Sequence, residues 1–183
     1  MTHWNEADFA SIFGAIHPDL LRYLECSIGH SGAAQDIAQE TFVRLYRLGP
    51  GRVRPGEERF WLYRVASNLA RNEARRARTI ERIASLFRGA NSPRSVNPQV
   101  EAEIASERHR LLAALGTLPE SQRAAFLLRE QEELRYSEIA GVLGVSLAKV
   151  KVDIHRARIA LRAMLQPPDS RPAERQGATR HGL

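Results

Sequence analysis

The chain has 183 residues, a hydrophobic fraction of 43% and a formal net charge of +6, values that suit one medium globular domain or two small ones. No apolar run approaches the roughly 20 residues of a membrane span, and the first residues have neither the basic start nor the apolar core of a secretion signal. The composition therefore predicts a soluble, cytoplasmic protein, and the single cysteine, Cys26, excludes an internal disulfide and favours a buried thiol.

The charges are arranged in blocks along the chain. Residues 1–48 and 91–135 carry net charges of −3 and −1, whereas residues 49–90 and 136–183 carry +6 and +4. The second block has ten arginines against four glutamates, and the last has eight lysines and arginines against four acids. Two basic blocks separated by a mildly acidic one favour two separate contacts with a polyanion.

Two helices are predicted in the first block. Apolar residues at helical spacing run from Ala7 to Ile28 and stop at Gly29. We expect two helical pieces or one kinked helix there, because Pro18 interrupts the pattern. A second helix is predicted for residues 31–48. Its expected inner face consists of Ala34, Ile37, Ala38, Phe42, Leu45 and Leu48.

The segment 49–56, rich in glycine and proline, is predicted to be a loop with two arginines, followed by a helix from Glu58 to about Arg82. Aromatic residues open this helix, and arginines and asparagines crowd towards its end. The pattern suits nucleic acid, because arginines bind phosphates while aromatic and amide groups receive unstacked bases. The alternative is that the aromatic residues belong to the core, and for Phe60 we favour this alternative.

A domain boundary is predicted after this helix. Residues 80–87 can extend it, and the following RGANSPRSVNPQV, with two prolines, has the composition of a linker. We expect helical domains at residues 1–82 and 106–165, a flexible linker at 83–105 and a disordered tail at 166–183. The expected fold class is all-α, with two small helical domains and a helix-turn-helix in the second.

The second domain is predicted to begin with one helix from Ile104 to Leu115 and another from Pro119 through Gln131. The segment 136–162 then predicts the helix-turn-helix. Ser137 is expected to cap its first helix, and Gly144 allows a left-handed turn. Ser146 is expected to cap its second helix, which runs to about residue 165.

This last helix is apolar on one side and basic on the other, as in a DNA recognition helix. The alternative is a helix pair whose basic face is only solvated and binds no DNA. The rest of the chain decides between DNA binding and this alternative. The inner stripe consists of Val150, Ile154, Ala157 and Leu161. The outer face carries Lys149, Lys151, His155, Arg156, Arg158 and Arg162.

Four segments follow one another along the chain: DIAQETFVRLYR at 36–47, FWLYRVASNLARNEARR at 60–76, LPESQRAAFLLRE at 118–130, and YSEIAGVLGVS with HRARIALR within 136–162. In this order and spacing they resemble the extracytoplasmic-function group of the sigma-70 family, over about residues 7–165. The resemblance implies a protein that binds core RNA polymerase, directs it to promoter DNA and helps to open the DNA. Many members of the group are held inactive by an anti-sigma factor, so the resemblance makes such a partner plausible; no membrane insertion is expected.

The resemblance also implies roles for particular residues. The helix that matches 34–48 docks on the clamp helices of the largest polymerase subunit, through Asp36, Gln39, Glu40 and Arg44. The segment that matches 60–78 reads and melts the −10 element, through Trp61 at the melted junction, Asn68 at a flipped base, and Arg71, Asn72, Arg75 and Arg76 on the exposed strand. The second helix of the turn motif enters the major groove at the −35 element, through Ser146, Lys149, Lys151, Val152, Asp153, His155, Arg156 and Arg158.

The recognition helix departs from the pattern of the group at its start. Asp153 replaces a usual arginine and is expected either to repel phosphate or to accept a hydrogen bond from a cytosine amino group. Val152 can contact a thymine methyl group. If Asp153 faces the DNA backbone, Asp153→Arg is expected to raise non-specific DNA affinity and to steepen its salt dependence.

The spacing of the two promoter elements agrees with two linked domains. About 25 base pairs correspond to roughly 80 Å. The segment of about 27 residues from Thr79 to about Ala105 reaches at most on the order of 90 Å, so two small domains joined by it can span the distance. A single compact domain of this length cannot.

Three other functions are weighed. A DNA-binding regulator that does not join polymerase leaves the aromatic and basic segment 60–78 unexplained. An enzyme is disfavoured, because the six histidines are scattered and no HExxH, phosphate-binding glycine loop or nucleophile elbow occurs. We therefore expect no catalytic residue, cofactor or metal site, and we interpret Glu132 and Glu133 as surface charge. An inhibitor of polymerase is distinguished only by a functional assay.

Overall fold

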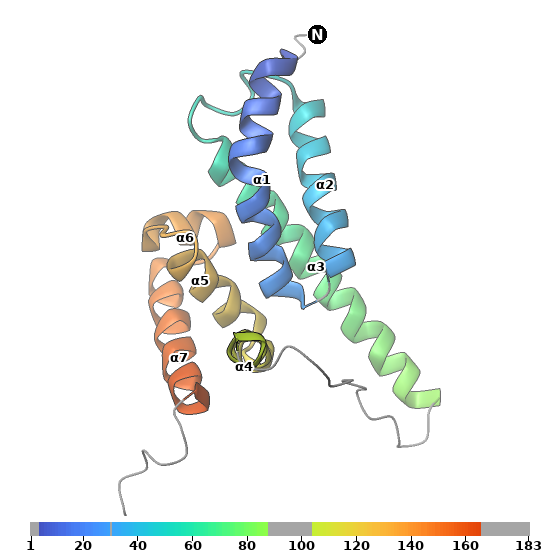
Figure 1. The fold of residues 1–183 in the computed structure, drawn as a ribbon, viewed down its shortest axis with the longest axis vertical. Helices are drawn as coiled ribbons and strands as arrows, with labels where there is room; N and C mark the ends of the chain where they lie inside the picture. Colours follow the sequence, from blue (N-terminus) through green and yellow to red (C-terminus); the bar gives the residue numbers. More distant parts are fainter. Residues whose placement is uncertain (1–3, 30, 88–103, 166–183) are drawn as a thin grey trace, which may run out of the picture.

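The computed structural model describes residues 4–29, 31–87 and 104–165, and within them the chain forms seven helices and no strand (Figure 1). The all-α fold class is therefore confirmed. Most of the predicted linker and the whole predicted tail lie outside the described residues. The first domain contains α1 (Glu6–Ile28), α2 (Ser31–Leu48) and α3 (Glu58–Phe87). The second contains α4 (Ile104–Thr117), α5 (Glu120–Glu130), α6 (Tyr136–Leu143) and α7 (Leu147–Leu165).

Helix α1 is continuous across Pro18 and is not divided into two pieces. Asn5 caps its start, since the Asn5 side chain accepts a hydrogen bond from the N–H of Ala7 at 3.1 Å. It ends at Gly29, whose φ of 79° lies in the left-handed region that favours glycine. Pro18 cannot donate to the carbonyl of Gly14, but both residues are exposed, so water can hydrate that carbonyl and the helix continues.

The first domain packs its three helices around one apolar core. The predicted inner face of α2 is confirmed except at Leu48, which is 38% exposed. Leu48 is the last residue of α2, and the chain turns at Gly49 with a φ of 84°, so its side chain extends past the core. Phe60 is half-buried against the core, as expected, and Cys26 is half-buried where a buried thiol was predicted.

The second domain contains the predicted helix-turn-helix in α6 and α7. Helix α6 begins two residues earlier than a cap at Ser137 predicts, and Arg135 occupies the N-cap position. The Glu138 carboxylate accepts a hydrogen bond from the N–H of Arg135 at 2.6 Å, which satisfies that first donor without a serine. Gly144 adopts the predicted left-handed conformation with a φ of 65°. Ser146 caps α7 as predicted, because its hydroxyl oxygen accepts from the N–H of Lys149 at 3.2 Å.

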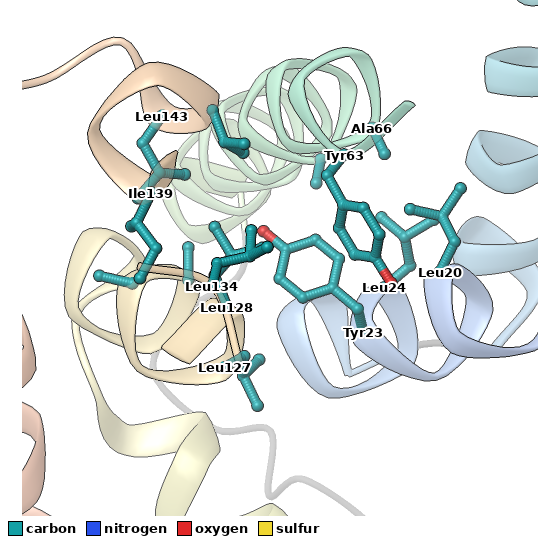
Figure 2. Close-up of a cluster of buried hydrophobic side chains, with 14 of the residues drawn as sticks. Leu20, Tyr23, Leu24, Tyr63, Ala66, Leu127, Leu128, Leu134, Ile139 and Leu143 are labelled. Atoms are coloured by element: carbon teal, nitrogen blue, oxygen red, sulfur yellow. The ribbon is translucent and has the colours of Figure 1, made fainter. Parts of the chain in front are cut away.

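The two domains are packed against each other. Helix α3 lies against α6, and α1 lies against both α4 and α5 (Figure 1). Figure 2 shows Tyr23 of the first domain pointing toward Leu128 and Leu134 of the second, with Tyr63 beside Tyr23. Both tyrosines are fully buried, so the apolar core continues from one domain into the other.

Among the described residues, no helix combines the length and the hydropathy that crossing a membrane requires.

Candidate polymerase and nucleic-acid interfaces

The outer face of α2 presents the four side chains that were predicted to bind polymerase. Asp36 and Gln39 are exposed. Glu40 and Arg44 form an ion pair at 2.8 Å in which both side chains remain nearly half exposed. Such a surface pair contributes little to stability, so its charges remain available to a partner.

An open groove of about 680 Å³ lies beside this face, between α1 and α2. Its lining is mainly aromatic and apolar, with Gln39 among its residues. Phe13 is 39% exposed and stacks on His17, and Tyr46 is 49% exposed. The position of α2 leaves this part of α1 open to solvent.

Trp61 lines a second open pocket of about 530 Å³ at the start of α3. Arg52 and Arg54 of the loop 49–57, together with Arg64 on α3, contribute three guanidinium groups to the same pocket. Arg64 was not among the predicted site residues. It follows Trp61 by three positions, a spacing that places both side chains on the same face of a helix and could have indicated it.

The other predicted −10 residues follow one another along α3. Asn68, Asn72, Arg75 and Arg76 are exposed. Arg71 is half-buried instead, and its guanidinium donates to the carbonyl of Leu143 at the end of α6 at 3.2 Å. The structure therefore leaves four of these side chains accessible and holds Arg71 against the second domain.

Helix α7 exposes most of the predicted −35 residues. Its inner stripe is buried as predicted. Asp153 differs, because it is only 5% exposed and pairs with Lys149 at 2.8 Å, one helical turn earlier. Asp153 also lines a small cavity with Tyr23, Arg71 and other residues between the two domains. The exposed residues are Ser146, Lys149, Lys151, Val152, His155, Arg156 and Arg158.

Arg158 is not free of partners on this surface. Its guanidinium donates through Nε to the Glu130 carboxylate of α5 at 3.1 Å. This hydrogen bond raises the pKa of Arg158 further above its ordinary value. Arg158 therefore remains charged, but DNA would have to compete with Glu130 for it.

An acidic side chain of the second domain, Glu132, binds side chains of α3. Glu132 is 3% exposed, which corrects its interpretation as surface charge; its neighbour Glu133 is exposed, as expected. The Glu132 carboxylate accepts hydrogen bonds from Tyr63 and, at 2.9 Å, from Arg59. Burial raises the pKa of Tyr63 well above its usual range, and the hydrogen bond to Glu132 raises it further, so the hydroxyl keeps its proton.

Comparison with known proteins identifies both domains. Residues 12–80 match the family Sigma-70 region 2, and residues 108–161 match Sigma-70, region 4. The chain is 36% identical over 148 residues to the ECF RNA polymerase sigma factor SigE of Mycolicibacterium smegmatis, which covers 80% of this chain and 57% of that protein. It is 37% identical over 145 residues to the RNA polymerase sigma-H factor of Pseudomonas aeruginosa, which covers 73% and 74% respectively.

The fold is also that of solved sigma factors. The sigma factor RpoE of Bartonella quintana, in complex with the anti-sigma factor NepR, aligns with a TM-score of 0.70 at 21% identity, over 86% of this chain and 96% of that one. CnrH, in complex with the cytosolic domain of CnrY, aligns with a TM-score of 0.65 at 24% identity, over 88% and 89%. With its region 2 and region 4 domains in this order, the chain belongs to the extracytoplasmic-function group of the sigma-70 family of RNA polymerase sigma factors.

Proposed function

We propose that this protein binds core RNA polymerase, directs it to promoters with two separate elements and assists the opening of the DNA there. The observation that carries the proposal is the occurrence of region 2 and region 4 sequences in one chain, each with a basic face of its own. The protein acts as an initiation factor, and the polymerase supplies the chemistry of RNA synthesis.

Polymerase binding is assigned to the outer face of α2. Its polar side chains are exposed and mix both charges, as expected of a surface that docks on a charged helical partner. We assign Asp36, Gln39, Glu40 and Arg44 to this contact. The neighbouring aromatic groove adds apolar area on the same side of the domain, because Gln39 also belongs to its lining.

The −10 element is assigned to α3. A single strand is bound when arginines follow the phosphates and aromatic or amide groups receive the bases. Trp61, Asn68 and Asn72 supply the second kind of group along the same helix that carries Arg75 and Arg76. We assign Arg71 to the same strand, which requires it to leave the carbonyl of Leu143.

The −35 element is assigned to α7. The exposed face of the second helix in a helix-turn-helix is the part that enters the major groove. Here that face carries Lys149, Lys151, Val152, His155 and Arg156. Basic side chains hold the phosphates, and Val152 offers an apolar contact to a thymine methyl group.

An anti-sigma factor is a further proposed partner. Among the solved structures of similar fold, one is a sigma factor in complex with an anti-sigma factor, and another is CnrH in complex with the cytosolic domain of CnrY. The aromatic groove between α1 and α2 and the basic faces of α3 and α7 are surfaces that such a partner can cover.

Run-off transcription tests the function directly. Purified core RNA polymerase is incubated with genomic DNA fragments, with and without this protein, and the transcripts are sequenced. New start sites that share two upstream elements are expected. Binding to polymerase without new starts would indicate an inhibitor, and specific duplex binding without any polymerase binding would indicate a conventional DNA-binding regulator.

A further inference from the structure

Lysine is confined to one helix of this chain. Of the 27 lysine and arginine residues, only Lys149 and Lys151 are lysines, and the other 25 are arginines. Both lysines lie in α7, on the face assigned to the −35 element, and both are exposed. The basic residues assigned to polymerase and to the −10 element are all arginines. Every side-chain amine of the sequence therefore belongs to one DNA-binding face.

Lysine and arginine respond differently to activated acyl groups. Both carry a positive charge at neutral pH, but a lysine amine becomes a nucleophile once it loses one proton, whereas the delocalised guanidinium of arginine keeps its charge. Acylation turns lysine into a neutral amide and removes its charge and its capacity to form an ion pair. One chemical modification can therefore discharge part of the −35 face and leave the arginines of α2 and α3 unchanged.

The two lysines of α7 differ in what their amines contact. The Lys149 amine donates a hydrogen bond to the Asp153 carboxylate at 2.8 Å, and the side chain of Asp153 is only 6% exposed. Lys149 must break this ion pair before its amine can react. Lys151 is exposed and forms no ion pair within the part of the chain that the structure describes. The amine of Lys151 is therefore the accessible nucleophile of α7.

We propose that Lys151 is an acylation site at which an activated acyl group, carried by an acyl phosphate or an acyl thioester, weakens the binding of the −35 element. The inference rests on the proposed function, because it takes α7 as the helix that binds this element. It adds a way to regulate the second domain alone. The modified chain keeps its polymerase and −10 contacts and loses one basic contact with the DNA at the −35 element.

The reaction needs only the amine and the acyl donor. The Lys151 ammonium first gives one proton to water, and the neutral amine attacks the carbonyl carbon of the donor. An amide C–N bond forms as the C–O bond to phosphate, or the C–S bond to the thiol, breaks. The second proton leaves with the phosphate or the thiol. The side chain thereby changes from a cation to a neutral amide.

The loss of one charge has a defined effect on duplex DNA. Each lysine that contacts a phosphate of B-DNA contributes about 0.9 to the slope of log affinity against log salt. Acylation of Lys151 is expected to lower that slope by about this amount and to weaken duplex binding about tenfold. Binding of single-stranded DNA is expected to stay the same, because the basic residues assigned to it are the arginines of α3.

The first test maps the modified residues. The full chain is incubated with acetyl phosphate or, in a separate arm, with acetyl coenzyme A, and its peptides are analysed by mass spectrometry over time. Lys151 is expected to be acetylated several-fold faster than Lys149. In Asp153→Asn, Lys149 is expected to approach the rate of Lys151, because its ion pair is removed. The arm that modifies Lys151 identifies the donor. Equal rates in the parent protein, or no modification by either donor, would overturn the proposal.

The second test measures DNA binding after acetylation, with a fluorescent duplex and a fluorescent single strand, both of random sequence. Lys149→Arg and Lys151→Arg form a matched pair, since each keeps the charge of α7 and leaves a single lysine. Each protein is compared with its own untreated sample. Treatment is expected to lower the duplex affinity of Lys149→Arg, as in the parent, and to leave those of Lys151→Arg and of the single strand unchanged. An equal loss in both variants, or no loss in Lys149→Arg, would overturn the proposal.

Lys151→Gln gives an independent measurement, because it carries a neutral amide without any treatment. Its melting temperature is expected to equal that of the parent, since Lys151 is exposed, while its duplex affinity and its run-off transcription are expected to fall. Unchanged transcription by Lys151→Gln from promoters that the parent uses would overturn regulation through Lys151. Failure of the parent itself to give new start sites would instead overturn the proposed function, whereas the map of acetylated residues would stand.

Discussion

Glu132 and Tyr63 lie 69 positions apart in the sequence, yet their side chains share a hydrogen bond that is buried between the two domains. The Tyr63 hydroxyl donates, and the same carboxylate oxygen also accepts from Arg59. A buried carboxylate is stable only when such donors surround it. This small group of residues therefore couples the folding of one domain to its contact with the other.

Tyr63→Phe is expected to lower the free energy of unfolding by about 1–3 kcal/mol, because the Glu132 carboxylate loses a donor without gaining water. Urea denaturation followed by circular dichroism measures the change. Tyr46→Phe serves as the control, since Tyr46 is 49% exposed and should change stability by less than about 0.5 kcal/mol. Equal effects of the two variants would contradict a role for the Tyr63 hydroxyl.

Stability is expected to fall between pH 10 and pH 12 because of Tyr23. Burial raises the pKa of Tyr23 to about 12, and its hydrogen bond with Ser67 only partly offsets this. The pKa of Tyr23 is higher in the folded chain than in the unfolded chain, so its contribution to the free energy of unfolding is fully present below pH 10. As the pH rises further, the unfolded chain ionises first and this contribution is lost. Between pH 9 and pH 11, the free energy of unfolding of the parent should fall by about 1 kcal/mol more than that of Tyr23→Phe, as measured by urea denaturation. An identical pH profile in the variant would rule out Tyr23 as the source.

Asp153→Asn separates two roles of this residue in α7. Asp153 is buried against Lys149, so the variant is expected to lose about 1 kcal/mol of stability and to keep its DNA affinity. If Asp153 instead accepts a hydrogen bond from a cytosine when the protein binds promoter DNA, the variant will lose preference at a single base pair. A comparison of promoter fragments that differ at one −35 position distinguishes these outcomes.

Arg75→Ala and Arg76→Ala are expected to weaken single-strand binding without destabilising the fold, because both side chains are exposed. Each removed phosphate contact should reduce the slope of log affinity against log salt by about 0.7. Fluorescence polarisation at several salt concentrations measures the slope. Arg22→Ala, an exposed arginine of α1 that pairs with Asp19, is the control and should leave the slope unchanged.

Asp36→Arg is expected to weaken the binding of core RNA polymerase about tenfold while the melting temperature stays constant, because Asp36 is exposed on α2. Glu133→Arg makes the same change of charge on an exposed position of the second domain. A titration of labelled protein with purified polymerase compares the two. If both variants lose affinity equally, the effect is one of total charge and α2 is not the docking face.

Local patterns were enough to predict the helices. The apolar stripe of α7 and the glycine turn before it depend on residues within a few positions of one another, and the structure confirms both. The predicted cap of α6 at Ser137 was wrong, because the Glu138 carboxylate accepts a hydrogen bond from the N–H of Arg135 and no serine is required. The family resemblance was likewise carried by short segments, which the comparisons confirm.

The sequence by itself therefore determined the helices, the order of the two domains and the family. The tertiary structure alone decided which charged groups are buried. Glu132 and Glu133 are chemically identical neighbours, and only the position of α3 buries one and leaves the other in water. Asp153 likewise lies beside the inner stripe of α7, where it is buried at a cavity lined by residues of both domains. Burial of a charge requires partners from distant parts of the chain, and periodicity along one helix carries no information about them.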